Sequence, residues 1–84
     1  MKKISTDKLV NTVIRLRKEK GLTQVQLAEA TGINRAMIGR LEKSDYIPSV
    51  EQLQQLGEVL GFEVVDLFVD ERELNKVNNR TIDK

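Results

Sequence analysis

The chain has 84 residues, enough for one small domain with a single modest core. It contains no cysteine and no histidine, which excludes disulfide bonds, cysteine nucleophiles and the commonest general base and neutral metal ligand. The opening segment MKKISTDKLV has no apolar run long enough for a signal peptide or a membrane span, so we expect a soluble, cytoplasmic protein without membrane association.

The net charge of +1 hides an asymmetry along the chain. Residues 1–44 carry ten basic and four acidic side chains, a net charge of +6, whereas residues 45–84 carry four basic and nine acidic side chains, a net charge of −5. A basic half attracts a polyanion and an acidic half repels one. A random distribution of surface charge is an equally good explanation, so the asymmetry alone does not decide the function.

Helical periodicity and capping residues together predict five helices. The first begins after Ser5 or Thr6, either of which can cap it, and ends at Gly21. The second covers about 24–31, and Gly32 then supplies the left-handed backbone that a sharp turn between helices needs.

Two capping boxes mark helix starts. Thr23 with Gln26 opens the second helix, and Ser49 with Gln52 opens the fourth, which ends at Gly61. In a capping box each of the two side chains accepts the backbone N–H of the other residue, so the boundary is well specified.

The remaining elements are shorter. Asn34 caps a third helix of about 35–42, and a fifth helix covers about 64–68. No segment alternates in polarity for long, so we expect no strands and an all-α fold. The helices form one domain over 6–69, and 70–84 is a polar tail that is either disordered or a helical start fading by about residue 78.

Residues 24–43, QVQLAEATGINRAMIGRLEK, carry the functional signal. They read as two short amphipathic helices joined by a tight turn, a helix-turn-helix. Apolar residues anchor the second helix to the core and fix its outward edge, which consists of Asn34, Arg35, Ala36, Gly39, Arg40 and Lys43. Such an edge suits the major groove of DNA.

Each residue type on this edge has a use at DNA. Arg35 and Arg40 can each donate two parallel hydrogen bonds to a guanine, Asn34 can read adenine or hold a phosphate, and Ala36 can touch a thymine methyl. At the start of the second helix, Gln24 and nearby backbone N–H groups can bind a phosphate. Taken without the flanking motif, the arginines would more often be solvated surface side chains, and the motif reverses this preference.

The sequence from Gly21 to Phe68 resembles the phage-repressor and Cro type of helix-turn-helix domain, the xenobiotic-response-element type of regulator. The shared features are TQ-x-x-LA, a glycine nine positions into the motif, I-x-x-LE at its end, and P-S-x-x-x-L-x-x-L with L-G after the loop. The resemblance implies a five-helix, lambda-repressor-like fold and two-fold dimers on DNA. By position it assigns DNA contacts to Gln24, Asn34, Arg35, Ala36, Met37 and Arg40. We add Lys43, the last residue of the outward edge, to these expected contacts.

The same resemblance pairs Arg17 with Glu42 in a partly buried ion pair.

Two positions depart from the family pattern. Ser44 stands where the family usually has glycine, so we expect a strained or reshaped left-handed exit from the third helix. Asp45 stands where a basic residue is frequent, which weakens any phosphate contact from this loop.

The acidic end contains more apolar residues than a lone short helix can bury. We expect a core role for Leu67 or Phe68, and a homodimer patch formed by Val65, Phe68 and Val69.

These features predict a sequence-specific, dimeric DNA-binding regulator of bacterial or phage type, with repression favoured and residues 34–43 as the recognition helix on a near-palindromic site. Two alternatives stay open: an antitoxin or protein-interaction module with autoregulatory DNA binding and a partner at the C-terminal end, or the DNA-binding fragment of a larger protein. No residue pattern supports an enzyme, a metal site or a cofactor.

Overall fold

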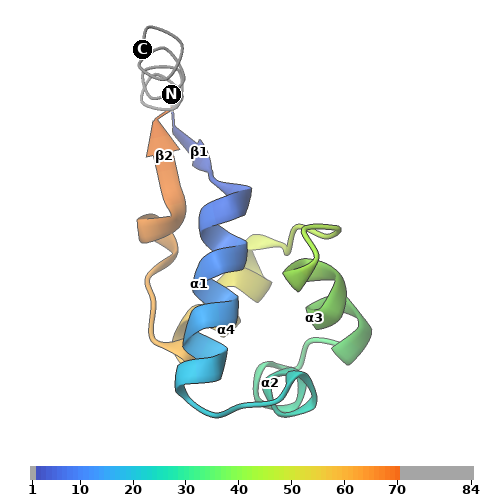
Figure 1. The fold of residues 1–84 in the computed structure, drawn as a ribbon. Helices are drawn as coiled ribbons and strands as arrows, with labels where there is room; N and C mark the ends of the chain where they lie inside the picture. Colours follow the sequence, from blue (N-terminus) through green and yellow to red (C-terminus); the bar gives the residue numbers. More distant parts are fainter. Residues whose placement is uncertain (1, 71–84) are drawn as a thin grey trace, which may run out of the picture.

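The computed structural model describes residues 2–70. Figure 1 shows a short two-stranded ribbon standing on a bundle of helices. The elements in chain order are β1 (Lys2–Ile4), α1 (Thr6–Glu19), α2 (Gln24–Thr31), α3 (Arg35–Glu42), α4 (Val50–Leu60), the 3₁₀ turn η1 (Val64–Leu67) and β2 (Phe68–Asp70).

The helix boundaries follow the expected capping residues. The Ser5 side chain accepts the Lys8 N–H at the start of α1 (3.2 Å). Both capping boxes are present, Thr23 with Gln26 before α2 and the second box before α4. The turn after α2 is left-handed at Gly32, with φ of 76°. The sequence-based boundaries of the four α-helices are therefore confirmed.

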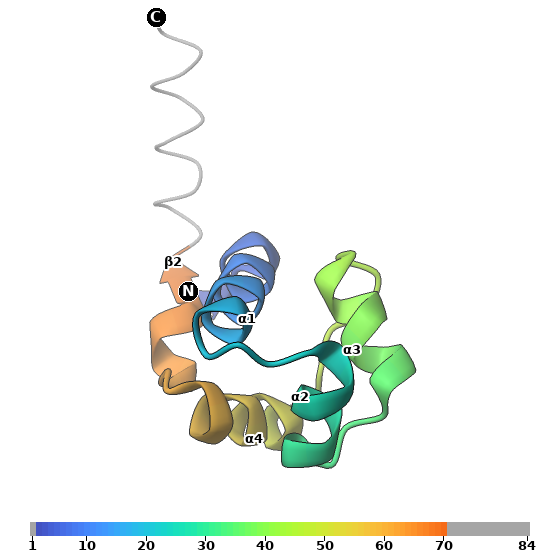
Figure 2. The same cartoon turned by 60° about the horizontal axis from the view of Figure 1, so that its bottom comes forward.

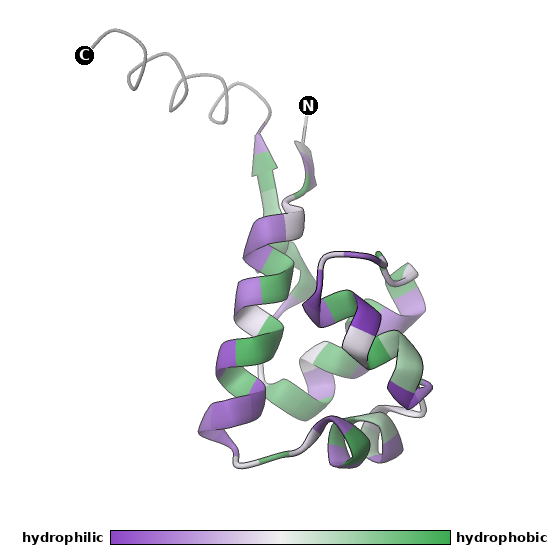
Figure 3. Ribbon diagram, turned by 45° about the vertical axis from the view of Figure 1, so that its right-hand side comes forward, coloured by the Kyte–Doolittle hydropathy of each residue, from purple (hydrophilic) through white to green (hydrophobic). Residues whose placement is uncertain are grey.

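One contiguous core joins the helices. Figure 3 shows the apolar side of α1 turned toward the other helices and its polar side turned outward. The fully buried side chains of the core come from all four α-helices and from η1. They are Leu9, Val13, Leu27, Ile38, Leu41, Leu53, Leu56, Leu60 and Leu67. Leu67 thus takes the core role expected at this end, whereas Phe68 is 38% exposed.

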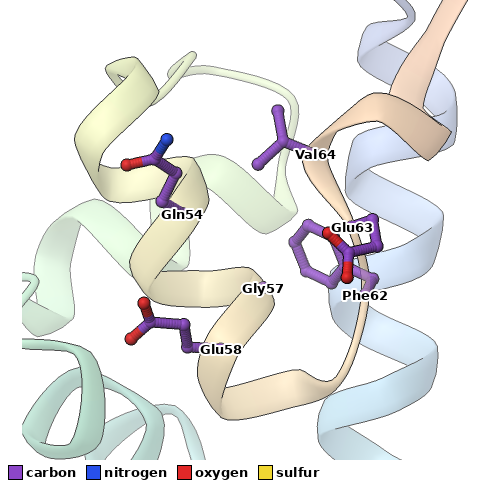
Figure 4. Close-up of a pocket in the computed structure, with 6 residues that line it drawn as sticks. All are labelled: Gln54, Gly57, Glu58, Phe62, Glu63 and Val64. Atoms are coloured by element: carbon purple, nitrogen blue, oxygen red, sulfur yellow. The ribbon is translucent and has the colours of Figure 1, made fainter.

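The chain passes very close to α4 at Gly57. A Cβ atom at this position would lie 2.5 Å from the Phe62 carbonyl oxygen, so only glycine fits without movement of the backbone. This approach lets the Phe62 N–H bond to the Gly57 carbonyl (3.1 Å) and turns the chain back toward α1. Figure 4 shows the surface hollow beside this contact, which is lined by Gln54, Gly57, Glu58, Phe62, Glu63 and Val64.

The expectation of no strands is wrong. β1 and β2 pair antiparallel, with Lys3 opposite Val69 and Ile4 opposite Phe68. The expected fifth helix is a 3₁₀ turn, and Phe68 leaves it to begin β2 instead. The Ser5 N–H donates to the Leu67 carbonyl (3.0 Å), which extends the pairing past the strands. Each strand has only three residues, so tertiary pairing of the two ends decides their conformation.

The helical framework of the expected fold is thus present, with four α-helices, one 3₁₀ turn and a small sheet in the described part. The expected helical or disordered tail beyond residue 70 lies outside the described residues. Within residues 2–70 no helix has the length and apolarity needed to cross a membrane.

Candidate nucleic-acid interface

Helix α3 lies at the outer side of the molecule, and α2 packs across it (Figure 2). Ile38 and Leu41 are buried and fix the helix to the core. The half-buried Met37 also packs against the core, so it sits at the rim of the outward edge rather than on it. The exposed residues of this edge are Asn34, Arg35, Ala36, Arg40 and Lys43.

The start of α3 is capped in a way that defines what Asn34 can still bind. Its side-chain oxygen accepts the Ala36 N–H at 2.7 Å. The amide nitrogen makes no hydrogen bond within residues 2–70 and stays available as a donor. An adenine read in bidentate fashion needs both the oxygen and the nitrogen, whereas a phosphate needs only a donor. The cap leaves the amide nitrogen free, so Asn34 can donate to a phosphate without losing its bond to the Ala36 N–H.

The two arginines of α3 differ in their surroundings. Arg35 is exposed, and its guanidinium has no ion pair or hydrogen bond to the described residues. Arg40 lies 3.5 Å from Asp45, measured from Nε to Oδ2. Both guanidinium groups point away from the core, so either is accessible to a ligand that approaches α3.

A partly buried network ties α3 to α1 and α2. Arg17 donates from Nε to Glu42 Oε2 (2.6 Å) and from Nη2 to Oε1 (3.0 Å), so the carboxylate is held at both oxygens. A third guanidinium nitrogen donates to the Leu22 carbonyl (2.8 Å). The hydrogen bond to Glu42 is the main cause that raises the pKa of Arg17, which keeps the group charged. The ion pair inferred from the family resemblance thus exists in this structure.

The same carboxylate positions Gln24, the first residue of α2. Gln24 Nε2 donates to Glu42 Oε1 at 3.1 Å, and its Oε1 would lie 3.8 Å from a Cβ atom at Gly39. The Gln24 side chain is therefore held beside the outward edge of α3. An amide nitrogen carries two hydrogens, so one remains for a phosphate at the N-terminus of α2.

Sequence reasoning missed two parts of this site. The first is Asp45 as a partner of Arg40, because residues five apart do not share a helix face. The second is Thr31, whose buried hydroxyl donates to the Leu27 carbonyl (2.8 Å) and accepts the Ile33 N–H (3.2 Å). These bonds satisfy backbone groups at the turn between the helices, and a threonine just before a turn glycine is the only sequence signal for them.

Charge is distributed unevenly among the elements of the fold. Residues 45–70 contain six acidic side chains and no basic one, whereas residues 2–44 have a net charge of +6. The basic residues thus belong to β1, α1–α3 and the turns between them, and the acidic residues of 45–70 belong to the loop after α3 and to α4, η1 and β2. A polyanion would be attracted to the helices of the basic segment, α3 among them, and repelled by α4 and η1. Within residues 2–70 no group of acidic side chains is arranged to hold a metal ion.

The expected dimer patch lies at the acidic end. Val65 is 70% exposed and Phe68 is 38% exposed, while Val69 is half-buried in β2. All three stand at the side of the fold that carries η1 and the ribbon (Figure 1), so a partner could cover them without covering α3.

Residues 13–67 match the helix-turn-helix family HTH_3. The chain is 38% identical over 56 residues to the immunity repressor protein of Bacillus phage phi105, covering 67% of this chain and 39% of the repressor. It is 44% identical over 54 residues to an uncharacterised HTH-type transcriptional regulator of Methanothermobacter thermautotrophicus, covering 63% of this chain and 78% of that protein.

A solved structure of an HTH_3 family transcriptional regulator from Vibrio cholerae matches the fold with a TM-score of 0.64 and 27% identity, covering 70% of this chain and 33% of that one. The chain therefore spans well under half the length of the phage repressor and of the Vibrio regulator. From the family match and the shared fold, the chain belongs to the Cro and C1 type of helix-turn-helix family, HTH_3, whose members are DNA-binding transcriptional regulators.

Proposed function

We propose that this chain is a homodimeric repressor that binds a near-palindromic DNA site, with residues 34–43 in the major groove. The observation that carries the proposal is the rigid outward edge of α3. Buried Ile38 and Leu41 hold the helix, and the Arg17–Glu42 pair fixes its end against α1. The helix is therefore in place before DNA binds, and binding has to order only the exposed side chains of its edge.

The roles of the edge residues follow from their surroundings. Arg35 and Arg40 read guanines, because an exposed guanidinium can reach O6 and N7 together. Ala36 contacts a thymine methyl. Asn34 caps α3 with its side-chain oxygen and donates to a phosphate from its amide nitrogen.

Phosphates on either side of the groove complete the contact. Gln24 holds one phosphate at the N-terminus of α2, where the helix dipole also favours an anion. Lys43, at the far end of α3, neutralises another. Because such contacts release counterions, affinity falls as salt rises.

Dimerisation uses Val65, Phe68 and Val69. Two recognition helices then enter successive major grooves about 34 Å apart. Val65→Asp should shift the protein to a monomer in sedimentation experiments and weaken binding to a two-half-site duplex. Val50→Asp, at another exposed valine (62%), is the matched control and should change neither. A wild-type protein that stays monomeric even on its DNA would contradict the dimer and leave this face for a different protein partner.

The decisive experiment is selection of bound duplexes from a random library, followed by salt titration of the selected sequence. We expect a consensus with two-fold symmetry and an affinity that falls with salt. Arg40→Ala should cost about 1–3 kcal/mol of binding free energy and relax one position in each half-site. Recovery of no consensus, or an Arg40→Ala variant with the parent's sequence preference, would refute the assignment.

A further inference from the structure

Asp45 lies beside a guanidinium that is proposed to read DNA. Its Oδ2 is 3.5 Å from Arg40 Nε, and the side chains are 71% and 55% exposed, respectively. An exposed ion pair contributes little to stability, so folding alone does not account for an acidic residue at the end of the recognition helix.

The backbone holds Asp45 in this place. Ser44 adopts a left-handed conformation with φ of 63°. The Ser44 N–H donates to the Leu41 carbonyl (3.0 Å) and the Asp45 N–H to the Arg40 carbonyl (2.8 Å). These two bonds are the Schellman pattern of helix ends, in which the residue after the left-handed one returns to the last turn. In this motif the two residues at the positions of Arg40 and Asp45 usually make an apolar contact, and here they form an ion pair instead.

The contact engages one particular nitrogen of Arg40. Of the three nitrogens in the guanidinium, the carboxylate faces Nε, and both terminal nitrogens stay open. Two terminal N–H groups side by side match the O6 and N7 acceptors of guanine. A carboxylate at Nε therefore restricts the orientation of the guanidinium without competing for the atoms that read the base.

We propose that Asp45 is a positioning residue that sets base specificity by orienting Arg40 for guanine. The proposal rests on the proposed function, because it assumes that Arg40 reads a base. It differs from simple charge repulsion, in which Asp45 would weaken binding to every DNA sequence equally. Orientation instead acts at a single base pair of each half-site.

The test compares Asp45→Ala with Asp45→Asn on duplexes that carry each base pair at the position read by Arg40. Alanine removes both the charge and the acceptor, whereas asparagine removes the charge and keeps an oxygen that can accept from Nε. Both variants should bind all duplexes more tightly than the parent, because a negative charge is lost. Preference for guanine should fall about two- to fivefold in Asp45→Ala, the range expected for one exposed pair, and should be largely retained in Asp45→Asn.

Two controls isolate the effect. Glu58→Gln removes an exposed negative charge from α4 and should leave the base preference unchanged. In an Arg40→Ala background, Asp45→Ala should no longer alter the preference, because its effect passes through Arg40. Thermal unfolding of all variants separates this role from a loss of structure.

The experiment can refute the positioning role of Asp45 separately from the proposed DNA-binding function. If the parent selects a consensus and Arg40→Ala relaxes one position, but Asp45→Ala keeps the full guanine preference, Asp45 has no positioning role. The same holds if Asp45→Ala changes the preference equally in the Arg40→Ala background. If the parent shows no sequence preference, the proposed function is overturned and this inference with it.

Discussion

Removing the Glu42 carboxylate should destabilise the protein far more than removing an exposed one. The Arg17 and Glu42 side chains are only 13% and 9% exposed, and the carboxylate accepts from two nitrogens of the guanidinium and from Gln24. In Glu42→Ala, Arg17 keeps only its bond to the Leu22 carbonyl, so a mostly buried charge loses its counterion.

The magnitude follows from this burial. Breaking a fully buried pair costs about 3–5 kcal/mol, and the residual exposure places Glu42→Ala near the lower limit, at about 3 kcal/mol. For a domain of this size, that corresponds to a fall in Tm of about 12–24 °C. Urea denaturation followed by circular dichroism measures the free energy of unfolding directly.

Two further variants test the reasoning. Glu19→Ala breaks the pair between Arg15 and Glu19, whose side chains are 61% and 59% exposed, and should cost less than about 0.5 kcal/mol. Replacing Arg17 by Met and Glu42 by Leu together should restore stability to within about 1 kcal/mol of the parent, since no uncompensated charge remains. A double variant that is destabilised as much as Glu42→Ala, or more, would refute the argument.

Three glycine-related changes give further predictions. Ser44→Gly should raise the free energy of unfolding by about 1 kcal/mol in urea denaturation, because glycine adopts the left-handed backbone without steric cost; a loss of stability would contradict strain at this position. Gly57→Ala should lower it by about 1–3 kcal/mol, since its Cβ would meet the Phe62 carbonyl oxygen at 2.5 Å; unchanged stability would show that the loop moves freely. Gly39→Ala has room for a Cβ and should fold at least as stably while binding DNA more weakly in anisotropy titrations, because the methyl keeps the backbone from the groove; undiminished binding would place Gly39 away from the DNA.

Local signals in the sequence were sufficient to predict where the helices begin and end. The capping box of Thr23 and Gln26 and the left-handed Gly32 locate the helix-turn-helix to the residue, because each satisfies backbone groups within a few positions. The strands had no such signal. Ile4 pairs with Phe68, and a pairing so distant in sequence is decided by the tertiary structure rather than by three-residue propensities.

In the candidate site, too, local sequence patterns predict some features and tertiary contacts decide the others. Burial of Ile38 and Leu41 fixes which residues of α3 face outward, and helical periodicity is enough to predict that. The interactions that orient those residues are not periodic. Gln24 meets Glu42 across two helices, and Asp45 returns to Arg40 only because the chain turns left-handed after α3.

The central claim, that the outward edge of α3 is the surface that meets DNA, is tested most directly by NMR. Backbone amide shifts of the ¹⁵N-labelled protein should be followed while a duplex selected from the random library is added. The largest changes should fall on residues 34–43 and at the N-terminus of α2, with small changes on α4. Changes concentrated on α4, η1 and β2, with α3 unaffected, would contradict the account.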